Sequence, residues 1–108
     1  MKVGVPCSRL KELIEDATFP CTSEGEAMAV AFGAWLTGAE PTVYMQNSGL
    51  GNIVDIVTSL YHPYEVPLPT LLLSIRCKPY HHKPMYDITE ALLSLLNYEN
   101  VHRIIQEE

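Results

Sequence analysis

The chain has 108 residues, 47% of them hydrophobic, which suits one globular domain over residues 1–108 with a modest core. Its 13 acidic and 7 scattered basic residues give a formal net charge of −6, which argues against a nucleic-acid-binding surface. No apolar run approaches the roughly 20 residues that span a bilayer and no signal-peptide pattern is present, so we expect a cytoplasmic protein that does not contact membranes.

The cysteines give no sign of a metal site. They number 3, at wide spacing, and no CxxC or CxxH pair occurs. We therefore expect free thiols in a reducing compartment, and no metal held by this chain.

The first half of the chain alternates short apolar segments with helical patterns. Strands are predicted over residues 2–5, 18–21 and 42–45, and helices over residues 8–16 and from Ser23 to about residue 37. Ser8 and Ser23 are suitable N-caps, and Gly38 followed by Pro41 marks the end of the second helix.

The second half repeats this alternation. A glycine-containing turn over residues 46–52 leads to a helix over residues 53–61 and then to a proline-rich connector. The remaining predictions are a strand over 70–75, a polar loop over 76–84, a helix over 87–96, a strand over 101–105 and a frayed end over 106–108. The last helix is expected to bury one apolar face made of Ile88, Ala91, Leu92, Leu95 and Leu96.

Strands that alternate with helices predict an α/β fold with a mainly parallel sheet and right-handed crossovers. In such sheets, ligands bind beyond the carboxyl ends of the strands. Glu24 follows the second predicted strand, the 47–52 turn follows the third, and His81 and His82 follow the fourth. We therefore expect all of these polar features at one edge of the sheet.

Two carboxylates begin the helix after Ser23. Glu26 falls near the capping-box position, and on propensity alone both Glu24 and Glu26 could simply complement the helix dipole. The rest of the helix is rich in small residues, which permits close packing against a neighbour: Ala27, Ala29, Ala31, Gly33 and Ala34.

The turn Gln46-Asn47-Ser48-Gly49-Leu50-Gly51-Asn52 has two glycines two residues apart. Glycine permits positive φ and close approach of the backbone to a ligand. An isolated GxG is usually an ordinary strand-to-helix turn, but the flanking amides favour a binding role. No Gly-Lys-Ser/Thr follows, so this is not a phosphate-binding P-loop.

These motifs together resemble the pyrimidine-binding (PYR) domain of thiamine diphosphate enzymes. The resemblance is to sulfopyruvate and phosphonopyruvate decarboxylases, and it covers about residues 3–76. It rests on Gly4-Val5-Pro6-Cys7-Ser8, on Glu24 with its small-residue helix and Gly33, and on the stretch from Val43 to Asn52. It implies a three-layer α/β/α fold of the PYR type, here in a shortened version.

The resemblance also implies roles for individual residues. Glu24 would hydrogen-bond N1′ of the cofactor's aminopyrimidine ring and so act in catalysis. The turn would lie against the cofactor, which makes Gln46, Asn47, Ser48 and Gly49 candidates for binding it. His81 and His82 would match a His-His pair that helps protonate intermediates in some related decarboxylases, although a solvated loop explains them as well.

The family holds the diphosphate and its magnesium on a second (PP) domain with a Gly-Asp-Gly motif, which is absent here. The resemblance therefore implies a separate α subunit that shares thiamine diphosphate with a PP-domain (β) partner, which would hold Mg²⁺, in a homo- or hetero-oligomer. Sulfopyruvate, in coenzyme M biosynthesis, is the favoured substrate, because phosphonopyruvate enzymes usually carry both domains on one chain. Arg76, Lys78 and Lys83 could meet its anionic group. A non-catalytic module that retains the PYR fold and a flavodoxin-like small-ligand binder are the alternatives.

Overall fold

The computed structural model describes residues 1–6 and 19–106, so the helix predicted over residues 8–16 lies outside the described residues. Within these ranges the chain forms a five-stranded sheet of order β2-β1-β3-β4-β5. Every neighbouring pair of strands is parallel. The α/β class and the parallel sheet are confirmed, and the arrangement is compatible with a three-layer α/β/α fold.

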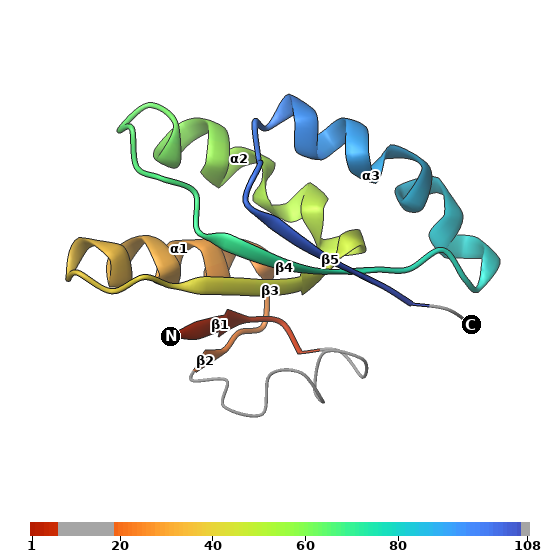
Figure 1. The fold of residues 1–108 in the computed structure, drawn as a ribbon, viewed down its shortest axis with the longest axis horizontal. Coiled ribbons are helices and arrows are strands. Elements are labelled where there is room, and N and C mark those ends of the chain that lie inside the picture. The colour runs from red at the N-terminus through yellow and green to blue at the C-terminus, as the bar shows by residue number, and fades with distance from the viewer. Residues whose placement is uncertain (7–18, 107–108) are drawn as a thin grey trace.

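The elements follow the predicted alternation (Figure 1). The strands are β1 (Lys2–Gly4), β2 (Phe19–Pro20), β3 (Thr42–Gln46), β4 (Thr70–Ile75) and β5 (Val101–Ile105). The helical segments are α1 (Glu24–Leu36), the 3₁₀ helix η1 (Asn47–Ile53), α2 (Val54–Ile56) with its π-helical continuation η2 (Val57–Tyr61), the 3₁₀ helix η3 (Tyr80–His82) and α3 (Lys83–Leu95). No described helix is long and apolar enough to cross a membrane.

The described helices cover one face of the sheet. The connections through α1, α2 and α3 all advance across the sheet in the same direction, and right-handed crossovers then put these helices on the same side. Alternate residues of the two central strands, such as Met45 and Leu73, are fully buried there. They form one hydrophobic cluster with Met28 of α1, Val57 of η2 and Leu93 of α3.

The last helix, α3, differs from its prediction in its first residue and in the side chains that it buries. It begins at Lys83 rather than at residue 87, because Pro84 lacks only an N–H that the first turn of a helix leaves unpaired anyway. Its buried residues are Thr89 and Leu93, followed by Leu96 just past its end. The predicted apolar face is therefore wrong for Ile88, Ala91 and Leu95, and Ile88 and Leu95 are 50% and 80% exposed. It is right for Leu96, which is buried, and for Leu92, which packs against the core.

Two other segments are more ordered than expected. The turn predicted over residues 46–52 is the 3₁₀ helix η1, and the helix predicted over 53–61 continues it through α2 and η2. The chain end is also not frayed at Gln106, which is buried; its N–H donates to the Ile75 carbonyl at 2.9 Å and its side chain to Ser74 Oγ. Residues 107–108 lie outside the described residues.

Candidate functional site

In the first turn of α1, the two carboxylates Glu24 and Glu26 make different contacts. Ser23 Oγ accepts a hydrogen bond from the Glu26 N–H at 3.2 Å, and Glu26 Oε1 accepts one from the Thr22 N–H at 3.1 Å. This reciprocal pattern is a variant of the capping box, because the carboxylate reaches the residue before the N-cap. Glu26 is thus engaged in capping the helix.

Glu24 instead contacts η1, the 3₁₀ helix that follows β3. Asn52 Nδ2 donates a hydrogen bond to Glu24 Oε1 at 2.7 Å. The Glu24 side chain also lies directly on the backbone of Gly49, since a Cβ added to that glycine would be 2.4 Å from Glu24 Cγ and 2.6 Å from Cδ. The half-buried carboxylate is therefore held between a carboxamide and a bare stretch of backbone.

The glycines of η1 permit close approach rather than unusual backbone angles. The described glycine with positive φ is Gly38, after α1, with φ of 93°. Gly49 is buried beneath Glu24, whereas a Cβ on Gly51 would meet nothing within 4 Å. Of the two glycines of η1, Gly49 is therefore the one with a steric reason to lack a side chain.

Asn47 connects η1 to Arg76, which follows β4, and to Thr89 in α3. Its Nδ2 donates to the Arg76 carbonyl at 3.3 Å and to Thr89 Oγ1 at 3.1 Å, and its Oδ1 accepts from the Arg76 N–H at 3.0 Å. Thr89 Oγ1 in turn donates to the Met85 carbonyl at 2.7 Å. Both amide hydrogens of the Asn47 side chain are already donated within the protein. Its predicted contact with a cofactor stays a prediction, and we expect the backbone rather than the side chain to make it.

The other predicted residues of this turn lie closer to solvent. Gln46 Nε2 donates to Ser48 Oγ at 3.2 Å, and Ser48 is exposed while Gln46 is half-buried. Gln46 is the last residue of β3 and Ser48 lies in η1, so both are at the carboxyl end of the strand, on the same edge as Glu24. Their roles in binding a cofactor stay predictions.

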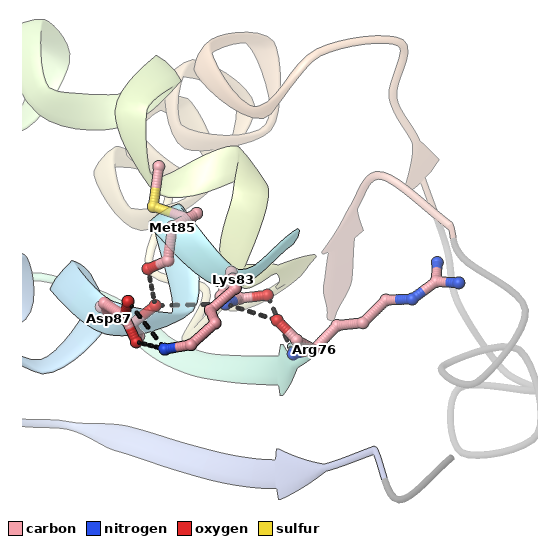
Figure 2. A network of polar contacts seen from close by, with 6 residues as sticks. Arg76, Lys83, Met85 and Asp87 are labelled. Atoms are coloured by element: carbon pink, nitrogen blue, oxygen red, sulfur yellow. Dashed lines mark hydrogen bonds and ion pairs between the residues drawn. The ribbon is translucent and has the colours of Figure 1, made fainter. Parts of the chain in front are cut away.

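His81 and His82 lie in η3, beyond the end of β4, with ring centroids 4.2 Å apart and an angle of 40° between the rings. The contacts of Glu24 run to η1, so the structure does not join the histidines to that carboxylate. Next to them, Lys83 Nζ is paired with Asp87 Oδ1 at 2.8 Å, and this hydrogen bond raises the pKa of Lys83 (Figure 2). The Arg76 side chain extends away from the Asn47 network (Figure 2).

Cys21 lies immediately after β2, near the start of α1, and is buried. Burial, and then the neighbouring Glu26 carboxylate, raises the pKa of its thiol above the ordinary value of a cysteine. It is therefore protonated at neutral pH and not activated as a nucleophile. Within the described residues, no group of three His, Cys, Asp or Glu side chains is placed to hold a metal ion.

The residue that sequence reasoning missed is Asn52. In the sequence it is only an amide that flanks the turn, yet it makes the direct hydrogen bond to Glu24. The only available signal was an asparagine one residue after the second glycine of the turn. The contact joins residues 28 positions apart, which no local pattern reveals.

The fold and this edge define a parallel α/β protein that presents a carboxylate where such sheets bind ligands. The sequence is also similar to those of known proteins. The chain is 43% identical over 108 aligned residues to phosphonopyruvate decarboxylase of Streptomyces viridochromogenes, covering 89% of this chain and 27% of that protein. It is 41% identical to the sulfopyruvate decarboxylase α subunit of Methanocaldococcus jannaschii, covering 65% of this chain and 44% of the relative.

The corresponding α subunit of Methanothermobacter thermautotrophicus is 42% identical, over 68% of this chain and 48% of the relative. No family model matches the sequence. The resemblance to sulfopyruvate and phosphonopyruvate decarboxylases is thus confirmed. The chain spans less than half the length of each of these relatives.

Proposed function

We propose that the chain is the pyrimidine-binding subunit of a thiamine diphosphate-dependent decarboxylase that converts sulfopyruvate to sulfoacetaldehyde and CO₂. The observation that carries the proposal is the Glu24 carboxylate, fixed by Asn52 over the backbone of Gly49. The relatives named as decarboxylases support the type of reaction, and those named as α subunits support a partner subunit.

The residues at this edge suit the aminopyrimidine half of the cofactor. Glu24 would hold N1′ through its carboxyl group, and the lack of a side chain at Gly49 leaves room for the Glu24 side chain in this position. Gln46 and Ser48 add polar groups at the same edge. When bound, thiamine diphosphate supplies the electron sink for the carbanion that decarboxylation leaves. A PP-domain partner would hold its diphosphate and Mg²⁺.

The remaining site residues are part of the same proposal. His81 and His82 would donate protons at the substrate end of the site, since an imidazole titrates near neutral pH. Arg76 and Lys78 would meet the anionic group of the substrate, because both follow β4 at the carboxyl edge of the sheet. Lys83 is a weaker candidate, because Asp87 already pairs with its ammonium group.

Phosphonopyruvate is the second candidate substrate, and coverage favours it. The phosphonopyruvate decarboxylase of Streptomyces viridochromogenes matches 89% of this chain, whereas the two α subunits match 65% and 68%. Both substrates are three-carbon 2-oxo acids with a second anionic group, so cationic side chains would serve either. The choice between them therefore needs a direct comparison of rates.

The test is a decarboxylation assay of the chain co-expressed with a PP-domain subunit, with thiamine diphosphate, Mg²⁺ and each acid offered separately. We expect turnover only with both subunits, and a loss of about 100-fold or more in Glu24→Gln. Glu26→Gln is the matched control and should retain the rate, because Glu26 caps α1. Equal losses in the two variants would contradict the assignment of Glu24. A stable, cofactor-loaded complex without turnover would instead support a non-catalytic interaction module.

A further inference from the structure

Among the described residues, Asn52 is the polar side chain that holds the Glu24 carboxylate. Glu24 begins α1, where its flexible side chain is half-buried and has several rotamers available. The described hydrogen bond that selects one of them comes from Asn52 Nδ2, at 2.7 Å from Oε1. This length is typical of a charge-assisted hydrogen bond.

The surroundings of Asn52 hold it close to the start of α1. A Cβ added to Gly25 would lie 3.3 Å from the Asn52 carbonyl oxygen, so the end of η1 packs tightly against the first turn of the helix. Glu24 Oε2 lies close to Gly49, since a Cβ built on that glycine would be 2.8 Å from this oxygen. The two carboxylate oxygens therefore have different neighbours, a carboxamide for Oε1 and bare backbone for Oε2.

We propose that Asn52 is a positioning residue: it fixes Oε1 of Glu24, so that Oε2 alone is presented to a ring nitrogen of the ligand. Hydrogen bonds to a carboxylate are strongest near its plane, so the rotation of the carboxyl group decides whether such a bond forms. The proposal rests on the proposed function for the identity of the ligand. The fixing of Glu24 itself does not depend on that function.

The first experiment observes Glu24 directly in the chain, through the ¹³C resonance of its carboxyl group. Asn52→Leu removes the donor at nearly constant volume, and Asn52→Asp replaces it with an acceptor. We expect both variants to shift and broaden the Glu24 signal at neutral pH. Asn100→Leu is the control, because Asn100 Nδ2 donates to Thr70 Oγ1 at the same 2.7 Å distance but at the opposite edge of the sheet. An unchanged Glu24 signal in Asn52→Leu would overturn the proposal.

The second experiment uses the complex with the PP-domain partner. Asn52→Leu should lower kcat about tenfold, the scale of one hydrogen bond to a charged group, and leave the KM for the 2-oxo acid unchanged. In Asn52→Asp, the rate relative to wild type should recover as the pH falls, because a proton bound by the new carboxyl group makes it a donor again. A merely structural role of Asn52 predicts the same loss in both variants at every pH, and that result would contradict the proposal.

The two experiments separate this inference from the proposed function. A wild-type complex without turnover would count against the decarboxylase, while the Glu24 resonance would still report whether Asn52 fixes the carboxylate. Conversely, an active complex in which Asn52→Leu retains the wild-type rate would overturn the positioning role and leave the decarboxylase standing.

Discussion

Gly49 and Gly51 lie two residues apart in η1 but have different surroundings. A Cβ on Gly49 would collide with the Glu24 side chain, whereas one on Gly51 would meet nothing within 4 Å. We expect Gly49→Ala to displace the Glu24 carboxylate from Asn52 and to lower decarboxylation at least tenfold. The free energy of unfolding should change by only about 1 kcal/mol, because a side chain rather than backbone gives way. Carboxyl NMR, urea unfolding and the coupled assay measure the three quantities.

Gly51→Ala is the matched control for this prediction. It adds the same methyl group to the same 3₁₀ helix without a contact, so its unfolding free energy should stay within about 0.5 kcal/mol of wild type. Its Glu24 resonance should also be unchanged. Equal effects of the two alanines would mean that the helical backbone, and not the contact with Glu24, requires glycine.

Asn47 offers a test between a structural and a ligand-binding side chain. Asn47→Ala removes its bonds to Arg76 and Thr89 from a buried site, so we expect about 2–4 kcal/mol of destabilisation in urea unfolding. Asn100→Ala should cost less than about 1 kcal/mol, since its hydrogen bond to Thr70 is exposed. If Asn47→Ala instead kept the wild-type stability and bound thiamine diphosphate more weakly, the Asn47 side chain would be a cofactor ligand.

At the scale of the elements, the start of α1 performs two separate tasks. Ser23 and Glu26 satisfy backbone N–H groups, while Glu24 reaches η1. Ser23→Ala should therefore destabilise the chain by about 1 kcal/mol in urea unfolding and leave the Glu24 carboxyl resonance in place. Ser59→Ala, which removes an exposed bond to Asp55, should stay within about 0.5 kcal/mol. A shifted Glu24 carboxyl resonance in Ser23→Ala would show that the helix cap also holds the Glu24 side chain in place.

The sequence predicted elements best where a short apolar run has clear boundaries. The observed bounds of β4 and β5 match their predictions, because both are dense in Leu, Ile or Val and each follows a turn. The buried face of α3 could not be predicted, because Thr89 is turned inward by a hydrogen bond to Asn47, 42 positions away. Ile88 and Leu95 look like core residues on local pattern alone, yet this bond and Leu93 decide which face is buried.

The same reasoning applies to the candidate site. That Glu24 and η1 share one edge follows from the order of strands and helices, which the sequence displays. That Asn52 rather than Asn47 meets Glu24 does not follow, since both are amides in one turn. The difference depends on how η1 coils, and two glycines in a turn do not specify a 3₁₀ helix.

At the scale of the whole molecule, the site rests on the centre of the sheet. Glu24 lies over η1, η1 continues directly from β3, and Asn47 attaches η1 to Arg76 at the end of β4. β3 and β4 each have two neighbouring strands, whereas β2 and β5 each have one in the described sheet. A site carried by the central strands is positioned by the most deeply packed part of the described chain.

This arrangement predicts a gradient of stability across the sheet, measurable by native-state amide hydrogen exchange. Amides of Val43 and Met45 in β3 and of Leu71 and Leu73 in β4 should exchange most slowly, because their side chains are fully buried. Those of β5 should exchange faster, and the exposed two-residue strand β2 fastest. Protection in η1 near that of β3 would show that the surface beneath Glu24 opens only with the core. If η1 exchanged as fast as β2, the site would open locally, and its geometry would then depend on a ligand or partner to hold it.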